Sequence, residues 1–513
     1  LFKILKIPTR ISYILLMFFL SFYAFLVEGR PSVLRATIMA LAYLCGKTFW
    51  KDISLINTLF MSAFLLLLLD PFQLFSLGFQ LTYAATLSII LFFPRILKLI
   101  PRLPFKISEM LVLSFTAQMG VLPFIALAFN RVTFSSILLN CAAIPLLGII
   151  MAMGFILLPT AFISLGIAQF LASILGFLIG QLIHLSTVMD GIKFMSFRVP
   201  TPYLWVVAGY FFFLLVFLLP IRSKKVRLTT VMGALVLLSI IIIHPFPVRT
   251  EHLCMTVLDV GQGESILIEF PGQKKMLIDG GGFPGSRFDV GEKVVSRFLW
   301  NKGIKAIDYL VLTHGHPDHL KGLISVAKNF HIMEYWEAFY PVQNTYYEKF
   351  KENLPSNIHH KRIFRGRDTH ISGVKIQALY PLRGNPEVFS VNNDQSLVLR
   401  LEYGKISILL TGDIEEKAES DLVANPYELN SQILKSPHHG SKTSSSFSFL
   451  RAVSPDIVVI SVGHNNMYGH PDKKILKRYN KIGATVYRTD KSGAIEISTD
   501  GEQLFIRTAV SQK

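Results

Sequence analysis

Metal-binding residue types are concentrated in one short stretch, Thr313-His314-Gly315-His316-Pro317-Asp318-His319-Leu320. Imidazole and carboxylate groups are common ligands of divalent cations. The spacing lets His314 and His316 bind one cation while Asp318 and His319 turn towards a second, about 3.5–4 Å away as in two-metal sites. The sequence therefore predicts a dinuclear metal centre.

The surrounding sequence predicts where this centre lies. Residues 307–312 form a short, mostly apolar run that is typical of a buried strand, so the ligands lie on the loop after a strand end. Two later segments follow the same pattern: residues 407–413 end in Asp413, and residues 432–441 carry His438 and His439. His470 follows in Tyr468-Gly469-His470-Pro471.

The motif His314-x-His316-x-Asp318-His319 resembles the signature of the metallo-β-lactamase fold, an αββα sandwich that hosts hydrolases of many substrate classes. The resemblance implies that Asp413 bridges the two ions. Spacing alone does not decide which of His438, His439 and His470 binds the second metal, and an imidazole that is not a ligand could donate a proton to the leaving group. The predicted metal ligands are His314, His316, Asp318, His319, Asp413, His439 and His470, and the predicted reacting groups are Asp318, Asp413, His438 and His439.

One position departs from the pattern. Many relatives of this fold have a histidine about twenty residues before the bridging aspartate, whereas this chain has Asn392-Asn393-Asp394. An amide oxygen is a harder and weaker ligand than imidazole, so Mn or Mg becomes plausible beside Zn. Three residues are candidates to support the ligands from behind: Asp259, Asp279 and Asn393. For the two aspartates, a plain role in the glycine turns that follow them is equally plausible.

Composition divides the chain into two parts. The chain has 513 residues, of which 51% are hydrophobic, and a net charge of +17. Residues 1–250 carry +14 of this charge and the remainder only +3, and only two of the 14 histidines precede residue 251. This asymmetry predicts a basic, multi-pass α-helical membrane domain at 1–248, followed by an α/β metallo-β-lactamase-like domain at 249–513. Three cysteines provide no disulfide framework.

Apolar segments recur along the first part at lengths near the ~20 residues that cross a bilayer. The segment at 33–46 is short and polar enough to be broken or re-entrant, and Pro159 is expected to separate two others. Basic residues in short loops stay on the cytoplasmic side, and their distribution places the second domain outside. The nine segments are 11–27, 33–46, 53–69, 74–93, 108–129, 134–158, 160–186, 203–220 and 228–246.

Polar residues inside these segments are expected to face protein or water. Four of them are predicted to line a channel: Arg35, Asn57, Gln80 and Asn140. The stretches 29–36, 70–85 and 140–145 resemble the competence domain of the ComEC family, the DNA-uptake channel of transformable bacteria. That family also has a metallo-β-lactamase-like domain after the membrane domain, and typically a further soluble N-terminal region, so we expect this chain to be a fragment of a longer protein.

The resemblance implies a bacterial inner-membrane protein that passes one DNA strand while its metal domain degrades the other. We expect binding of single-stranded DNA without sequence specificity, contact with membrane lipid, and work with other uptake proteins, including a separate ATPase because the chain has no phosphate-binding loop. The predicted DNA contacts are Lys435, Ser441, Lys442 and Arg488, although a solvated loop explains them equally well. Two alternatives remain: a channel whose metal domain binds DNA without hydrolysis, and a tethered metallo-hydrolase that cleaves thiol esters or lactams.

Overall fold

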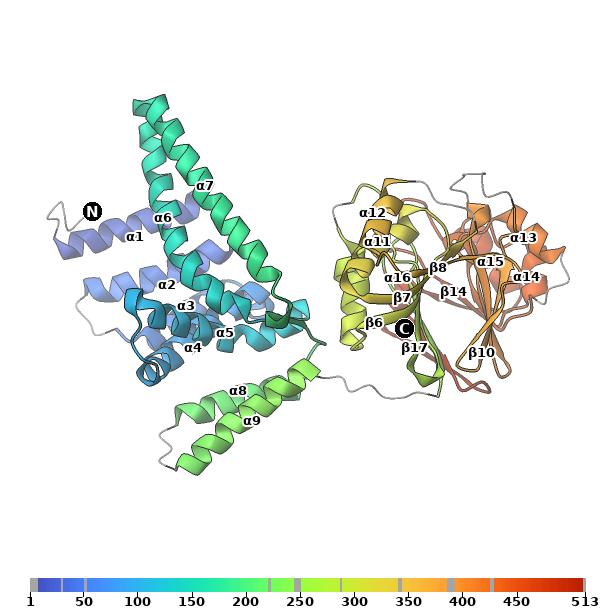
Figure 1. Cartoon of the computed structure of the whole chain (residues 1–513), viewed down its shortest axis with the longest axis horizontal. Helices are drawn as coiled ribbons and strands as arrows, with labels where there is room; N and C mark the ends of the chain where they lie inside the picture. Colours follow the sequence, from blue (N-terminus) through green and yellow to red (C-terminus); the bar gives the residue numbers. More distant parts are fainter. Residues whose placement is uncertain are drawn as a thin grey trace. The chain divides into compact units, whose positions relative to one another are not determined.

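The computed structural model describes residues 8–28, 31–49, 53–219, 223–243, 251–286, 288–339, 344–384, 393–424 and 429–510. The chain divides into two compact units, Leu1–Pro245 and Phe246–Lys513. Figure 1 shows that the first is almost entirely helical and that the second combines sheets and helices. The predicted fold class is confirmed.

Each predicted apolar segment overlaps one α-helix of the first unit. Five stretches, at 9–26, 77–99, 104–129, 135–163 and 165–190, are long and apolar enough to cross a membrane, and α3 and α8 are shorter apolar helices. The first unit is therefore a membrane domain. Its described helices are α1 (Thr9–Leu26), α2 (Pro31–Thr48), α3 (Leu55–Leu69), α4 (Leu77–Ile96), α5 (Ile107–Phe129), α6 (Ser135–Ile163), α7 (Leu165–Asp190), α8 (Leu204–Leu218) and α9 (Lys224–Ile243).

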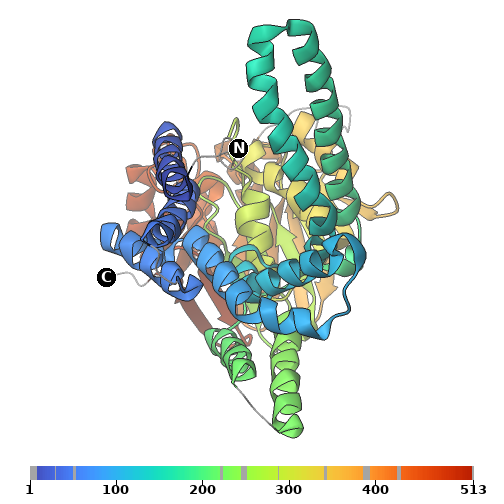
Figure 2. The same cartoon turned by 90° about the vertical axis from the view of Figure 1, so that its left-hand side faces the viewer.

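Two details of the predicted helix boundaries are wrong. Helix α2 is continuous and not broken, which leaves the re-entrant alternative a prediction, and α6 runs through Pro145 and Pro159. A proline removes only one helical N–H donor, and membrane helices tolerate this loss. The break falls instead at Ser164, whose extended backbone (φ −154°, ψ 116°) ends α6 before α7 begins, so the two helices form the long hairpin seen in Figure 2.

The four predicted channel residues lie on three neighbouring helices and on α6. Arg35 of α2 is buried and packs against Gly78 of α4, where an added Cβ would lie 2.8 Å from a guanidinium nitrogen. Gln80 donates to the carbonyl of Leu74 (3.1 Å), Asn140 is half-buried on α6, and Asn57 is exposed on α3. Their role in a channel stays a prediction.

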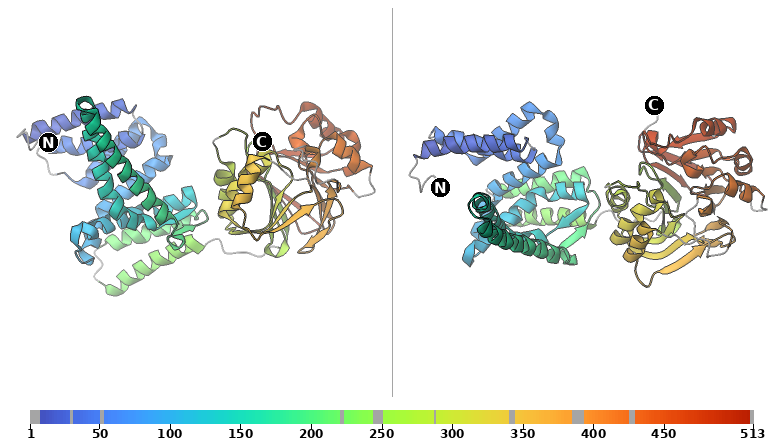
Figure 3. Two further views of the ribbon diagram at one scale, coloured as in Figure 1. Left: turned by 45° about the horizontal axis from the view of Figure 1, so that its top comes forward. Right: turned by 90° about the horizontal axis from the view of Figure 1, so that it is seen from above.

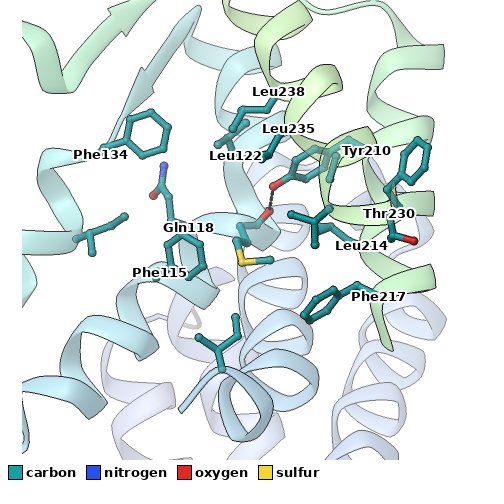
Figure 4. Close-up of a pocket in the computed structure, with 16 residues that line it drawn as sticks. Phe115, Gln118, Leu122, Phe134, Tyr210, Leu214, Phe217, Thr230, Leu235 and Leu238 are labelled. Carbon is teal, nitrogen blue, oxygen red and sulfur yellow. Dashed lines mark hydrogen bonds between the residues drawn. The ribbon is translucent and has the colours of Figure 1, made fainter. Parts of the chain in front are cut away.

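A cavity of about 300 Å³ lies between α5, α6, α8 and α9 (Figure 4). Its walls are almost wholly apolar, and the Tyr210 hydroxyl at its edge donates to the carbonyl of Met119 (3.1 Å). None of the four predicted channel residues lines this cavity. Nearby, the short strands β1 (Arg131–Thr133) and β2 (Ser196–Arg198) pair antiparallel and join the ends of α5 and α7.

The second unit contains two mixed sheets. In one sheet the strand order is β17-β16-β3-β4-β5-β6-β7-β8, and in the other it is β15-β14-β13-β12-β11-β10-β9. Strands β5 to β8 run parallel, as do β12 to β15. The strands are β3 (Leu253–Val257), β4 (Ile266–Glu269), β5 (Lys275–Ile278), β6 (Ala306–Leu312), β7 (His331–Ala338), β8 (His359–Ile363), β9 (Thr369–Ile371), β10 (Val374–Tyr380), β11 (Val398–Tyr403), β12 (Ile406–Leu410), β13 (Ile433–Lys435), β14 (Ile457–Ile460), β15 (Thr485–Arg488), β16 (Ile495–Thr499) and β17 (Leu504–Thr508).

Three hydrophobic cores separate the layers of this unit. One core, with Met255, Ile376 and Val459 among its members, lies between the sheets. A second packs α10 to α12 on the outer face of the first sheet, and a third packs α13 to α15 on the outer face of the other. Figure 3 shows these two helix groups on opposite faces of the paired sheets. The helices are α10 (Arg297–Asn301), α11 (Pro317–Asn329), α12 (Thr345–Asn353), α13 (Glu416–Val423), α14 (Phe447–Val453), α15 (Lys473–Lys481) and α16 (Thr489–Ser492).

Candidate metal centre

The carboxyl ends of the parallel strands carry the predicted ligands. Asp279 follows β5, His314 follows β6, Asp413 comes shortly after β12, and His439 follows β13. Carboxyl ends of neighbouring parallel strands meet at one edge of a sheet, and open α/β folds bind ligands at such edges. The sandwich therefore brings together residues that are far apart in the sequence.

Four side chains converge most closely: Asp318, His319, Asp413 and His439. One ligand atom from each lies within 4.8 Å of the others. The Oδ2 atom of Asp413 is central, 3.2 Å from His319 Nε2 and 3.4 Å from His439 Nε2, and His439 Nε2 is 3.6 Å from Asp318 Oδ2. This group has the composition of a site for one divalent cation.

His314 and His316 lie beside this cluster, and the ring centroid of His314 is 4.2 Å from that of His319. His314 Nε2 is 4.0 Å from Asp413 Oδ2 and 3.1 Å from His316 Nδ1. Burial and the neighbouring His319 lower the pKa of His314 well below its usual value, which keeps the imidazole neutral as a ligand must be. These two histidines with Asp413 form the candidate second site, with Asp413 between the two.

Asp279 fixes the metal loop from behind. Its Oδ2 accepts hydrogen bonds from His319 Nδ1 and from the Thr313 hydroxyl, both at 2.6 Å, and its Oδ1 accepts the Thr313 amide at 2.9 Å. A carboxylate on the far nitrogen of a ligand histidine fixes the tautomer and the ring orientation. Asp259 behaves differently: it is exposed and accepts the Gly261 amide in its own turn, and we find no bond from it to a ligand among the described residues.

Ser461 supports His439 in a similar way. The His439 Nδ1–H donates to the Ser461 carbonyl (2.9 Å), and the Ser461 hydroxyl donates to the carbonyl of Gly263 (2.8 Å) in the loop before β4. Three residues of the centre have a left-handed backbone: Asp279 (φ 58°), His438 (φ 44°) and His439 (φ 53°). Such conformations cost about 1–3 kcal/mol each and concentrate at functional sites.

In the four-residue cluster, the positive charges of protonated histidines compensate the negative charges of the carboxylates. Burial favours neutral His439, but Asp413 and Asp318 raise its pKa to about 9. Burial also favours the neutral form of His319. Asp413 and Asp279 nevertheless raise the pKa of His319 well above its usual value. Burial would raise the pKa of Asp318 and of Asp413, but the facing histidines lower both below the usual range.

The residues fit a divalent cation. Nε2 of His319, Nε2 of His439 and Oδ1 of Asp413 are buried, and none has a hydrogen-bond partner in the described part of the chain. Such atoms are costly to bury unless something binds them. A cation at this position would bind these atoms and replace the protons that balance the two carboxylates.

His438 and Asn393 lie at the rim of this cluster. His438 Nε2 is 4.0 Å from Asp413 Oδ2, and its Nδ1 is 3.0 Å from a carboxylate oxygen of Glu415. The Asn393 amide nitrogen is 3.3 Å from Glu415, and its Oδ1 is buried without a described hydrogen-bond partner. Asn393 therefore lies at the rim of the cluster, and its role beside the ligands stays a prediction.

His470 is separate from the four-residue cluster. Its ring stacks on Tyr468 and lies 5.7 Å, between centroids, from that of His438. Burial and the neighbouring His439 and His438 lower its pKa to about 4, so it is neutral at physiological pH. Its assignment as a ligand stays a prediction.

The predicted DNA contacts require correction. Lys435 is fully buried and forms an ion pair with buried Glu264, so the prediction that it contacts DNA is wrong. Ser441 is also buried, with its hydroxyl 3.0 Å from that of Thr443, and Arg488 forms two hydrogen bonds with Asp490 at 2.9 and 2.6 Å. Ser441 therefore does not present its hydroxyl to solvent as a surface contact would, whereas Arg488 is half-buried and its contact with DNA stays a prediction. Lys442 is exposed and stays a prediction.

Sequence reasoning missed Thr313, Glu264, Glu415 and Ser461. Thr313 stands beside the motif, but a hydroxyl there carries no spacing signal of its own. The other three lie about 50 to 150 residues from Thr313 in the sequence, so only the fold shows their contacts.

Comparison with known proteins agrees with this geometry. The sequence model of the family described as "Competence protein" matches residues 1–224, and that of the "Metallo-beta-lactamase superfamily" matches residues 258–464. The chain carries a competence-protein domain followed by a metallo-β-lactamase domain. The predicted resemblance to the ComEC family is confirmed over most of the chain.

Two relatives of this chain illustrate the match. "ComE operon protein 3" of Bacillus subtilis is 28% identical over 94% of this chain and 63% of its own length. "Competence protein ComA" of Neisseria gonorrhoeae is 31% identical over 52% of this chain and 35% of its own length. This chain thus spans less than two thirds of either relative.

Solved structures of metallo-β-lactamase fold are similar to part of this chain. The metallo-beta-lactamase fold protein YhfI from Bacillus subtilis is 14% identical, with a TM-score of 0.31 over 48% of this chain and 99% of its own. The fold assignment itself rests on the strand order and the match to the family.

Proposed function

We propose that this competence protein is a DNA-uptake channel of the bacterial inner membrane whose metallo-β-lactamase domain is a metal-dependent nuclease. Single-stranded DNA would cross through the membrane domain while the nuclease degrades the other strand. The observation that carries the nuclease assignment is the convergence of Asp318, His319, Asp413 and His439, of which His319 Nε2, His439 Nε2 and Asp413 Oδ1 are buried without a hydrogen-bond partner among the described residues. The ComEC resemblance supplies DNA as the substrate.

In this proposal Asp318, His319, Asp413 and His439 hold one divalent cation, and His314 and His316 hold a second with Asp413 between them. When bound, the cations would supply Lewis-acid chemistry at a phosphodiester. Asp279 and the Ser461 carbonyl orient the rings of His319 and His439. His438, which is less buried and lies beside Glu415, would donate a proton to the leaving oxygen.

The metal could be Mn, Zn or Mg, because Asn393 contributes an amide where an imidazole would favour zinc. Asn393 also motivates a second candidate function, in which the domain binds DNA without cleaving it because the metal site of His314 and His316 is weak. Partners in either case would be DNA without sequence preference, membrane lipid, and other uptake proteins with a separate ATPase.

Hydrolysis by the full chain in lipid nanodiscs tests the proposal. Purified protein should cleave labelled DNA only with an added divalent metal, and Asp318→Ala or Asp413→Ala should abolish cleavage. Metal-dependent binding without cleavage would favour the second candidate. Cleavage at the wild-type rate by either variant would show that the metal assignment is wrong.

The side of the membrane needs its own experiment. Basic loops are expected to place the metal domain on the extracytoplasmic side. A cysteine introduced at exposed Glu348 (Glu348→Cys) should react with an impermeant thiol reagent in whole cells, and one at Ser223 (Ser223→Cys) should not. The unmodified chain, with its three native cysteines, provides the background. Reversed labelling would place the nuclease in the cytoplasm.

A further inference from the structure

Helix α15, whose sequence is Lys473-Lys-Ile-Leu-Lys-Arg-Tyr-Asn-Lys481, has five basic side chains and no acidic one. At 100° per residue, these five side chains fall within an arc of about 140°. On the other side of the helix, Ile475 and Tyr479 are fully buried in the core that packs α13 to α15 against the second sheet. One face of α15 is therefore basic, and the opposite face belongs to the protein interior.

This helix is attached directly to the metal centre. The Asp472 amide, at its N-cap, donates to the carbonyl of Gly440, the residue after the candidate ligand His439 (2.9 Å). Pro471 packs so tightly on Gly440 that an added Cβ there would lie 2.7 Å from the proline ring. At the far end of the helix, the Tyr479 hydroxyl is 2.7 Å from the Ser436 hydroxyl, just before His438 and His439. The position of α15 relative to the loop that carries His438 and His439 is thus fixed.

The charges on this face are available to a ligand. Lys473, Lys474, Lys477 and Lys481 are exposed, and within the described residues no carboxylate forms an ion pair with any of them. Arg478 instead binds the carbonyls of Ser444 and Ser445 (3.1 and 2.9 Å), which attaches the loop that carries exposed Lys442. This concentration of positive charge occurs in a domain whose net charge is only +3.

We propose that Lys473, Lys474, Lys477, Lys481 and Lys442, named here the α15 face, bind the phosphate backbone of the DNA strand that enters the metal centre. The proposal rests on the nuclease function proposed above and specifies how its substrate is held. Lys473, Lys477 and Lys481 repeat at four-residue intervals and span about 12 Å. At 3.4 Å per phosphate along a helical strand, that length accommodates about three phosphates. Such contacts position a strand without reading its bases.

A membrane surface is the other polyanion that a basic helix could fit. A helix that lies in a bilayer interface inserts an apolar face. The apolar side of α15 is already occupied, because Ile475 and Tyr479 have no exposed surface. The geometry therefore favours nucleic acid.

Salt-dependent binding tests the proposal. The full chain in nanodiscs, with EDTA to prevent hydrolysis, is titrated with fluorescein-labelled polythymidine at several salt concentrations. Lys473→Ala with Lys477→Ala should reduce the slope of log affinity against log salt by about 1.4, since each phosphate contact to a single strand contributes about 0.7. Lys305→Ala with Lys328→Ala is the matched control, because these exposed lysines lie at the ends of β6 and α11 away from the metal loop. The control should keep the wild-type slope.

The outcomes separate this proposal from the nuclease function. If wild-type protein binds and cleaves DNA but the α15 double variant keeps the wild-type slope, the α15 face is not the phosphate contact and the nuclease function stands. If wild-type protein neither binds nor cleaves DNA, both proposals fail. If the double variant loses affinity for vesicles containing phosphatidylglycerol but not for DNA, the face is a membrane contact and the proposal is overturned. Lys473→Arg with Lys477→Arg, which keeps both charges, should retain the slope; a loss there would show disruption of the helix rather than of phosphate binding.

Discussion

Lys435 and Glu264 form an ion pair in which both side chains have almost no contact with solvent. Lys435 ends β13, four residues before the candidate ligand His439. The Glu264 amide donates to the carbonyl of Asp318 (3.1 Å), and the Glu264 carbonyl accepts the Gly281 amide (2.7 Å). The pair therefore joins the loop before β4, which lies behind Asp318, to strand β13, which precedes His439. Strands β4 and β13 belong to different sheets.

Removal of one charge from this pair should be strongly destabilising. Lys435→Met leaves Glu264 as an uncompensated buried charge, and we expect the metallo-β-lactamase domain to lose about 3–5 kcal/mol of unfolding free energy. Hydrogen exchange of the β3 and β13 amides in the full chain measures this loss. Lys302→Met is the control, because Lys302 pairs with Glu269 and Glu496 in a more solvated setting and should cost about 1 kcal/mol or less. Equal losses in the two variants would contradict this account of Lys435.

Asp279→Asn should weaken metal binding while it preserves the side-chain shape. An amide has one acceptor oxygen and no charge, so it cannot accept the His319 Nδ1–H, the Thr313 hydroxyl and the Thr313 amide together as the two carboxylate oxygens do, and the ligand ring is held less firmly. We expect a 10–100-fold lower metal affinity, measured by competition with a chelating dye. Asp308→Asn should leave that affinity unchanged, because Asp308 accepts the Lys275 amide at the opposite end of β6. Unchanged affinity in Asp279→Asn would remove this residue from the centre.

Two nearby glycines distinguish backbone strain from a direct clash. Gly261→Ala places a Cβ in open space at φ +74° and should cost about 1–2 kcal/mol of strain. Gly263→Ala brings a Cβ within 2.2 Å of the Asp318 carbonyl, so it should cost a further 1–3 kcal/mol, about the usual penalty of overpacking, and lower metal affinity as well. Thermal unfolding of the two variants, each with and without added metal, measures both their stability and their metal affinity. Equal metal affinity in the two variants would show that Asp318 is not held by this loop.

The metal-free and metal-bound proteins should respond differently to pH. The pKa of His439 rises from 6.5 to about 9 on folding without metal, so its stabilisation is complete below pH 6.5 and disappears as pH rises through 9. The lowered pKa values of Asp318 and Asp413 have the opposite effect: their stabilisation is present above pH 4 and is lost as pH falls further. A bound cation requires neutral His439, so the increase in melting temperature on metal addition should be larger at pH 9 than at pH 6. An equal increase in melting temperature at pH 6 and at pH 9 would contradict displacement of the His439 proton by the metal.

The local parts of this centre could be predicted from the sequence and the distant parts could not. His314, His316, Asp318 and His319 share one loop, so their types and spacing were sufficient to predict a metal centre. Asp413 was identified by the apolar strand before it together with the resemblance to a known fold. Lys435 was misassigned because a lysine near a site is usually exposed, and its partner Glu264 is 171 positions away. The α15 face was missed because its lysines become relevant only once Gly440 and Asp472 are known to touch.

The pairing of β16 with β3 affects the order in which this domain can assemble. Strand β3 is the first strand of the metallo-β-lactamase domain to leave the ribosome, yet one of its two neighbours lies at residues 495–499. Until those residues are synthesised, one side of β3 is an open edge, which is a site for wrong pairing. Asp413 and His439 also emerge about a hundred residues after the metal loop. Until the chain beyond residue 439 is synthesised, the nascent domain would thus carry only part of the candidate metal centre.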